Sequence, residues 1–166
     1  MARRVLYVDM TLCMGCQTCE SVCRFLHGEA LIKVYEPIKG MYVPMTCRHC
    51  ERAPCLEVCP THALYRDEDG AVLVDPTKCI GCAMCTFVCP FGIPEISPRK
   101  RYVIKCDMCR DLRDQGLPPA CAQLCPASAI SFGSFEEVID RVRARNAEIL
   151  ARLRLLRVPV RTVPIY

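Results

Sequence analysis

Sixteen of the 166 residues are cysteines, and they fall into four groups of four. The thiolate is a soft metal ligand, so cysteines at short, repeated spacings point first to metal chemistry. In chain order the groups, called groups one to four below, are Cys13, Cys16, Cys19 and Cys23; Cys47, Cys50, Cys55 and Cys59; Cys79, Cys82, Cys85 and Cys89; and Cys106, Cys109, Cys121 and Cys125.

Groups one and three share the spacing C-x2-C-x2-C-x3-C. This is the spacing of bacterial ferredoxins, in which three close thiolates hold one face of a cubane cluster and the fourth ligates the neighbouring cluster. Three of the four groups also end in Cys-Pro. Sixteen ligands, with four to each cluster, predict four [4Fe–4S] clusters and leave no cysteine over.

Two other uses of cysteine agree less well with the sequence. Disulfide-rich scaffolds are short secreted domains made behind a signal peptide, and we see no such signal here. Zinc ribbons use two pairs of cysteines separated by a spacer, whereas group one places three cysteines within the seven residues from Cys13 to Cys19. Zinc in group four, where eleven residues separate Cys109 from Cys121, stays open as an alternative.

The charge and hydropathy exclude some partners. The formal net charge of +4 counts every thiol as neutral, whereas an oxidised [4Fe–4S] core with four thiolates carries about −2, so four clusters bring the protein to roughly −4. The basic run at residues 99–101 has no aromatic ladder beside it, and we expect no nucleic-acid partner. No stretch approaches the ~20 apolar residues that cross a bilayer, so we expect no membrane span.

The expected compartment is the cytoplasm, because sixteen ligand thiolates need reducing conditions during assembly. Arg3 and Arg4 do not start a twin-arginine export signal, since such a signal needs an apolar segment and Cys13 follows nine residues later. Export together with a partner stays open.

Short strands and turns are expected to position the cysteine groups. Alternating apolar segments around a turn with glycine predict β-hairpins, and a further short strand should follow group four; the segments are 31–35 with 41–45, 63–65 with 71–74, and 127–132. Between the third and fourth cysteine of each group we expect one helical turn that a following proline ends. The predicted fold is α+β, with tandem bacterial-ferredoxin-like units made of short β-hairpins and cluster-binding loops, plus a C-terminal helix.

Residues beside the cysteines could tune the clusters. Gly15 and Gly81 precede a second cysteine, where a residue without Cβ allows a tight turn that brings N–H groups toward cluster sulfur and raises the reduction potential. Lys78 and Lys105 precede a first cysteine; they either raise the potential by their charge or are ordinary exposed lysines. No histidine is expected to be a ligand, because sixteen thiolates complete four clusters; the histidines are His27, His49 and His62.

Five motifs resemble those of the four-cluster electron-transfer subunits of the dimethyl sulfoxide reductase and formate dehydrogenase type, in a soluble short form. The resemblance covers about residues 5–133. The motifs are Cys47-Arg48-His49-Cys50, Ala53-Pro54-Cys55, Cys79-Ile80-Gly81-Cys82, Cys89-Pro90-Phe91-Gly92-Ile93-Pro94 and Lys105-Cys106-Asp107-Met108-Cys109. One departure is Arg24, which stands where the other groups have proline.

This resemblance implies a nested pairing of the groups. Group one exchanges its last cysteine with group four, and group two exchanges its last cysteine with group three. The implied ligand sets are cluster A, Cys13, Cys16, Cys19 and Cys125; cluster B, Cys106, Cys109, Cys121 and Cys23; cluster C, Cys47, Cys50, Cys55 and Cys89; and cluster D, Cys79, Cys82, Cys85 and Cys59.

A complete cysteine set leaves every iron saturated, so no cluster offers an open site to a substrate, and no glycine-rich nucleotide fingerprint is present. We therefore expect a non-catalytic subunit that passes single electrons between a catalytic subunit and a second redox subunit or carrier. The resemblance favours a tungsten- or molybdenum-dependent aldehyde or formate oxidising complex, with a nickel carbon monoxide dehydrogenase or hydrogenase as the alternative. An iron–sulfur enzyme with substrate chemistry at a cluster is the disfavoured alternative of another class.

The last segment carries no cysteine, so we divide the chain into a four-cluster domain, 1–133, and a helix with an extended tail, 134–166. Ser134 and Glu137 fit a capping box, and good helix formers continue to Pro159, which predicts a helix of about 23 residues. Its apolar face either covers the protein's own core or docks on a catalytic subunit or a second copy of the chain; it consists of Val138, Val142, Ile149, Leu153 and Leu156.

Overall fold

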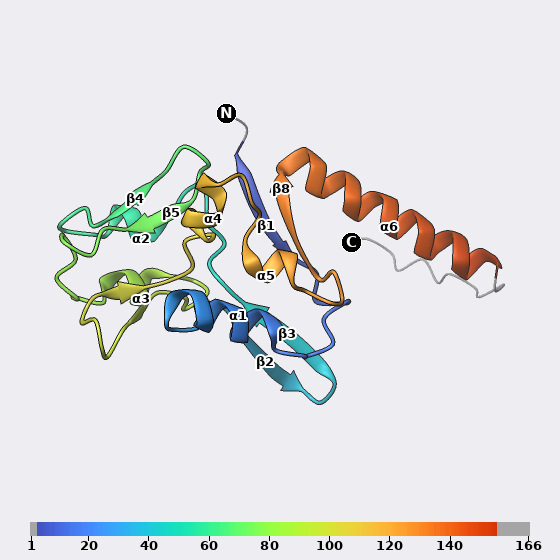
Figure 1. The fold of residues 1–166 in the computed structure, drawn as a ribbon, viewed down its shortest axis with the longest axis horizontal. Coiled ribbons are helices and arrows are strands. Elements are labelled where there is room, and N and C mark those ends of the chain that lie inside the picture. The colour runs from blue at the N-terminus through green and yellow to red at the C-terminus, as the bar shows by residue number, and fades with distance from the viewer. Residues whose placement is uncertain (1–2, 156–166) are drawn as a thin grey trace, which may run out of the picture.

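The beginning of the chain lies beside the segment that follows the last cysteine group. Strand β1 (Arg4–Val8) pairs antiparallel with strand β8 (Ile130–Ser134), in a register that runs from Arg4 opposite Ser134 to Val8 opposite Ile130. The computed structural model describes residues 3–155, and Figure 1 shows the two strands side by side. The predicted strand after group four is confirmed, whereas its partner β1 is not among the predicted strands.

Three further antiparallel pairs complete the β-structure of the described residues. They are β2 (Lys33–Ile38) with β3 (Met41–Met45), β4 (Leu64–Arg66) with β5 (Val72–Val74), and β6 (Glu95–Ile96) with β7 (Val103–Ile104). The first two are the predicted hairpins, and the third is not predicted from the sequence. Small strand pairs interspersed with helices confirm the α+β class.

Short helices carry the third cysteine of each group, as predicted. They are α1 (Thr18–His27), α2 (Pro54–Glu57), α3 (Met84–Val88) and α5 (Ala120–Gln123), while α4 (Arg110–Asp114) follows Cys109. Proline follows the last cysteine of three groups and cannot continue a helix. Arg24 has no such restriction, so α1 runs past Cys23 to His27 and ends at Gly28, whose φ of 77° is left-handed.

Two small apolar cores lie under the cysteine loops. The outer core joins groups one and four and contains Leu6, Val8, Ile32, Leu73, Ile130 and Phe132 with Cys19, Cys23 and Cys121. The inner core joins groups two and three and contains Ala53, Leu64, Val72, Val103 and Cys85. Because cysteines make up part of each core, metal ligation must supply much of the folding free energy.

A buried ion-pair network connects the half of the protein around the outer core, called the outer half, with the half around the inner core, called the inner half. Arg113 in α4 donates through Nη2 to Asp67 Oδ2 (2.7 Å), through Nη1 to Asp69, and through Nε to the carbonyl of Met108 (3.1 Å). Both aspartates belong to the turn between β4 and β5. Burial by itself lowers the pKa of Arg113, but the hydrogen bonds and charges of Asp67 and Asp69 raise it above its ordinary value. The turn of the inner half is therefore clamped to a helix of the outer half.

Helix α6 (Phe135–Leu155) begins with the predicted capping box. The Ser134 N–H donates to Glu137 Oε2 (2.9 Å), and the Glu137 N–H donates to Ser134 Oγ (3.2 Å). The first turns pack on β1 and β8: Val138 is buried, and Arg145 forms an ion pair with Asp9 at the end of β1. This part of the helix covers the protein's own core.

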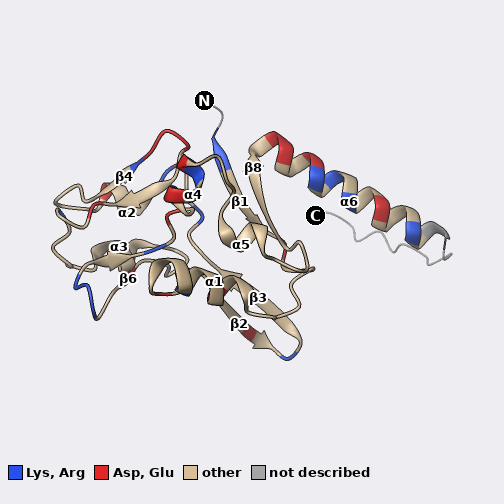
Figure 2. Ribbon diagram, viewed as in Figure 1, with Lys and Arg blue, Asp and Glu red and all other residues tan. Residues whose placement is uncertain are grey.

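The second half of α6 leaves the core. From residue 146 onward nearly every side chain described is exposed, including those of Ile149 and Leu150. Figure 1 shows the helix projecting away from the rest of the molecule, and Figure 2 shows that it carries charges of both signs. Leu156 and the predicted extended tail lie outside the described residues. Among the helices described, none combines the length and the apolar composition needed to cross a bilayer.

Candidate metal centres

One cavity is lined by four cysteines from opposite ends of the sequence. Its wall contains Cys13, Cys16, Cys19 and Cys125, together with apolar side chains such as Ile130. Pairing of β1 with β8 brings these segments together, because Cys13 follows β1 closely and Cys125 closely precedes β8. The four thiols are those of the predicted cluster A.

A second cavity lies beside the inner core. Its wall contains Cys59, Cys79, Cys82 and Cys85, which are the thiols of the predicted cluster D. The β4–β5 hairpin, directly after Cys59, supplies Leu64 and Val74, and β7 supplies Val103.

Neighbouring thiols also gather where clusters B and C are predicted. Burial raises the pKa of Cys121, and the nearby thiols of Cys106, Cys109 and Cys23 raise it further. Those four cysteines are the predicted set B.

At the predicted cluster C, burial raises the pKa of Cys55, the charge of Lys105 opposes that shift, and the nearby Cys47 and Cys89 add to it. Cys50, the remaining member of the set, is half-buried against the same apolar core as Cys55.

The donor chemistry fits iron–sulfur clusters. All sixteen cysteines lie within the described residues, and all are free thiols. Burial, the largest cause in each case, raises the pKa of Cys19, Cys85 and Cys109 to about 11 and that of Cys106 to about 12. Buried thiols with such high pKa values hold their protons until a cation replaces them, so metal binding must release protons and stabilise the fold together.

Backbone N–H groups point at several cysteine sulfurs. The donor and acceptor pairs are Leu31 to Cys23 (3.3 Å), His49 to Cys47 (3.4 Å), Ala63 to Cys59 (3.3 Å), Val103 to Cys79 (3.5 Å) and Met108 to Cys106 (3.4 Å). Hydrogen bonds to ligand sulfur favour the reduced state of a cluster and raise its potential.

The residue before the second cysteine has a left-handed backbone in every group. Its φ is 73° at Gly15, 45° at His49, 69° at Gly81 and 57° at Met108. The predicted turns at the two glycines are confirmed, and a Cβ at Gly15 would meet the ring of Tyr42 at 2.6 Å. In the described structure, however, N–H···S bonds at this position come from His49 and Met108 rather than from the glycines. Positive φ in non-glycine residues left no signal in the sequence.

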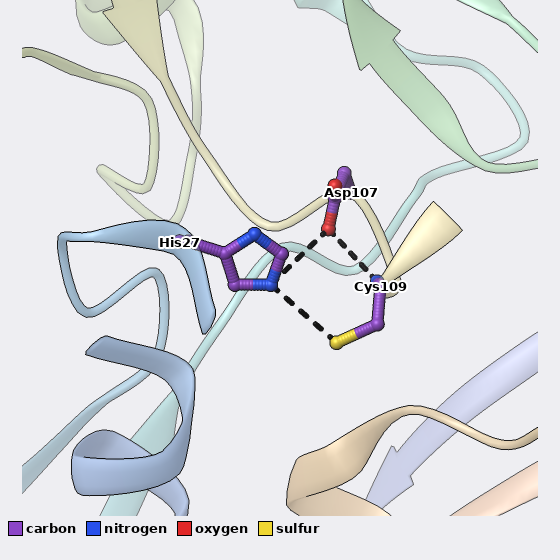
Figure 3. A group of neighbouring side chains, drawn as sticks. All are labelled: His27, Asp107 and Cys109. Atoms are coloured by element: carbon purple, nitrogen blue, oxygen red, sulfur yellow. Dashed lines mark hydrogen bonds and ion pairs between the residues drawn. The ribbon is translucent and has the colours of Figure 1, made fainter. Parts of the chain in front are cut away.

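One histidine contacts a predicted ligand (Figure 3). His27 Nε2 lies 3.5 Å from Cys109 Sγ and 3.8 Å from Asp107 Oδ1, and the Cys109 N–H donates to the same carboxylate oxygen (2.8 Å). These three side chains lie close enough to hold a metal ion, but Cys109 is already assigned to cluster B. His27 reaches group four only because α1 continues beyond Cys23.

Another histidine is buried beside group two. His49 Nδ1 accepts a hydrogen bond from the Val72 N–H (2.9 Å), so Nε2 carries the proton. That Nε2 is buried and has no partner among residues 3–155. Burial, helped by Lys105 and three arginines, lowers the pKa of His49 to about 2. A buried N–H donor normally has an acceptor. Because His49 directly precedes Cys50, a group bound by the cysteines would fit as the acceptor that the polypeptide does not supply.

Comparison with known proteins also points to iron–sulfur clusters. The 4Fe-4S dicluster domain matches residues 38–135. The chain is 39% identical over 147 residues to the thiosulfate reductase electron transfer subunit PhsB of Salmonella typhi, covering 80% of this chain and 77% of that protein. It is 33% identical over 164 residues to the B subunit of the anaerobic dimethyl sulfoxide reductase of Escherichia coli, covering 87% of this chain and 78% of that protein. The chain therefore belongs to the family of 4Fe-4S dicluster proteins that includes iron–sulfur subunits of bacterial reductases.

Proposed function

We propose that this chain is a non-catalytic electron-transfer subunit, which passes single electrons through four [4Fe–4S] clusters between a catalytic oxidoreductase subunit and a second redox subunit or carrier. The observation that best supports this function is that cysteines from groups far apart in the sequence lie together, above all around the cavity shared by Cys13, Cys16, Cys19 and Cys125. The named role of the thiosulfate reductase relative supports the same interpretation.

The protein arranges the proposed sites in a series. Clusters A and B draw their ligands from groups one and four, and clusters C and D draw theirs from groups two and three. Cys106 of set B lies close enough to Cys47 of set C for their charges to interact, so the order is A, B, C, D. When bound, each cluster supplies the one-electron chemistry, and the chain supplies the spacing and the surroundings.

The two ends of this series are the most accessible to partners. Among the sixteen cysteines only Cys16 of set A and Cys82 of set D are exposed, whereas every ligand of sets B and C is buried or half-buried. Exposed apolar side chains accompany both cysteines: Met14 lines the same cavity as Cys16, and Ile80 and Met84 line the same cavity as Cys82. Electrons would therefore enter and leave at clusters A and D.

The proposed function also requires a catalytic partner. We favour a tungsten- or molybdenum-dependent subunit, specifically of an aldehyde or formate oxidising complex, over a nickel enzyme. Anaerobic purification of the complex from its native host, followed by metal analysis, tests this choice. Tungsten or molybdenum with the chain supports it, and nickel contradicts it. Reducing conditions for sixteen thiolates remain the reason to propose assembly in the cytoplasm.

The nested pairing is tested by two matched single substitutions. Cys23→Ala should perturb cluster B and leave cluster A spectroscopically intact, whereas Cys125→Ala should do the reverse. Electron paramagnetic resonance of the anaerobically reduced proteins separates the two signals. Loss of the cluster held by Cys13, Cys16 and Cys19 in Cys23→Ala would refute the pairing.

We also propose that the segment from residue 146 onward, within the C-terminal unit 134–166, docks on the catalytic subunit. The exposed half of α6, with Ile149 and Leu150, supports this, because nothing of the described core covers it. A chain truncated after Arg145 keeps the contacts to Asp9 and Phe132. It should retain its iron but elute without the catalytic subunit in anaerobic gel filtration. Normal assembly of the truncated chain contradicts the docking role, and conversion from dimer to monomer would assign the segment to self-association instead.

A further inference from the structure

Two polar side chains that directly precede ligand cysteines are buried at the middle of the molecule. His49, just before Cys50, is 2% exposed, and Lys105, just before Cys106, is 5% exposed. Polar and charged residues are rarely buried to this extent unless a partner compensates them. His49 lies in the loop of group two and Lys105 in the loop of group four. These two loops meet where Cys47 of set C lies close to Cys106 of set B.

Both side chains bind the same strand residue. The Val72 N–H donates to His49 Nδ1 (2.9 Å), and Lys105 Nζ donates to the Val72 carbonyl and to the carbonyl of Cys106 (3.0 Å). Val72 lies in β5, is 1% exposed, and belongs to the inner core. One residue of the β4–β5 hairpin thus fixes the group-two loop and the group-four loop relative to each other.

The charge of Lys105 has no anionic partner within the described protein. Its two acceptors are carbonyl oxygens, and it is in none of the ion pairs found among residues 3–155. A buried ammonium without a counter-charge is strongly unfavourable. The predicted ligands lie next to this charge: Lys105 acts electrostatically on Cys55 of set C, and its ammonium donates to the backbone carbonyl of Cys106, a ligand of set B. Bound clusters would supply the negative charge that the protein itself does not place beside Lys105.

We propose that Lys105 is a buried cation shared by clusters B and C, which raises the reduction potentials of both and sets the central step of the electron path. This inference rests on the proposed four-cluster arrangement. Reduction adds one negative charge to a cluster, and a fixed positive charge in a low-dielectric interior stabilises the reduced form more than the oxidised one. The hydrogen bonds through Val72 hold that charge between the two loops.

The chain offers a matched control at Lys78. Lys78 precedes Cys79 as Lys105 precedes Cys106, but its side chain is 61% exposed and lies 3.5 Å from the carboxylate of Asp75. Water and Asp75 screen its charge from cluster D. Of the two lysines with the same sequence signal, only Lys105 has the surroundings of a tuning group.

The experiment is potentiometric titration, followed by electron paramagnetic resonance, of the anaerobically purified full chain and its variants. Lys105→Met should lower the midpoint potentials of clusters B and C, with about a tenfold fall in the reduced-to-oxidised ratio at fixed ambient potential, equal to about 59 mV for one electron. Lys105→Arg should restore the potentials, because it keeps the charge, and Lys78→Met should leave every cluster unchanged.

The proposal is overturned if Lys105→Met shifts clusters B and C no more than Lys78→Met does, or if it shifts clusters A and D equally. If Lys105→Met does not retain its iron, the decision rests on Lys105→Arg. Retention of iron in Lys105→Arg supports the requirement for a positive charge at this position, and loss of iron in both variants overturns the proposal. Failure of the proposed function is distinguishable, because it appears in the wild-type chain as fewer than four clusters or as no electron transfer to a catalytic subunit.

Discussion

Substitution of Arg113 by methionine should strongly destabilise the loaded protein. The Arg113 side chain is 2% exposed and bridges Asp67 and Asp69 in the β4–β5 turn. Methionine fills much of the same volume but removes the charge, so two carboxylates lose their shared cation. The effect should fall on the connection between the inner and outer halves, because this network joins α4 to that turn.

The expected magnitude follows from the burial of the three side chains. Removing one partner of a buried ion pair typically costs about 3–5 kcal/mol. Asp67 and Asp69 keep 14% and 26% of their side-chain surface exposed, so water can partly solvate them when Arg113 is gone. We therefore expect the lower end, about 3 kcal/mol, which corresponds to about 150-fold in an unfolding rate constant if the network is broken in the transition state.

Cluster proteins unfold irreversibly, so the measurement is a rate rather than an equilibrium. Loss of visible cluster absorbance in guanidinium under anaerobic conditions reports it. Arg110→Met is the control, since Arg110 lies in the same helix but makes only exposed side-chain contacts, an ion pair with Asp114 (3.7 Å) and a hydrogen bond to the Tyr65 hydroxyl (2.9 Å). Such exposed pairs contribute about 0.5 kcal/mol or less. If Arg113→Met accelerates cluster loss by less than tenfold relative to Arg110→Met, the network does not hold the halves together.

Three further outcomes are expected. Anaerobically purified protein should contain about sixteen iron and sixteen sulfide per chain and should unfold when chelated, whereas about twelve iron with one zinc would contradict four clusters. Burial raises the pKa of Asp9, but hydrogen bonds from Thr11 and Arg145 hold it below its ordinary value. The Asp9–Arg145 ion pair should therefore persist at neutral pH and weaken only as the pH falls through that lowered pKa. Asp9→Asn should remove the ion pair, and the check is faster hydrogen exchange in α6 around Arg145 with unchanged iron content. Arg24→Pro should end α1 at Cys23 at a cost of about 3 kcal/mol, and circular dichroism with unaltered helix content would refute this account of α1.

Local sequence signals predict the parts of this fold that depend on local interactions. The hairpin around Gly70 and the capping box at Ser134 are visible because their turn and cap residues lie within a few positions of each other. Strand β1 escapes prediction because its partner lies at the other end of the domain, with Arg4 opposite Ser134. The two-residue strands β6 and β7 are too short for any periodicity to show.

The surroundings of the site were less predictable than its ligands. Spacing predicts the cysteines as cluster ligands, and the family resemblance implies how the four clusters share them. The burial of His49 and Lys105 could not be predicted, because hydropathy places both side chains at the surface. The clamp from Arg113 to Asp67 likewise joins residues more than forty positions apart without a local pattern. Arg24 did carry a usable signal: the absence of proline after Cys23 is the physical reason that α1 extends to His27.

The pairing of β1 with β8 also sets the order in which the protein can be completed during synthesis. A ribosome makes Arg4–Val8 before all four cysteine groups and Ile130–Ser134 after them, so β1 has no partner strand until every group has been synthesised. The inner core has all its members between residues 53 and 103, so it can close around groups two and three before the outer core exists. The thiols of group one are thus the first made and the last enclosed, and they need the longest protection from oxygen while the chain emerges.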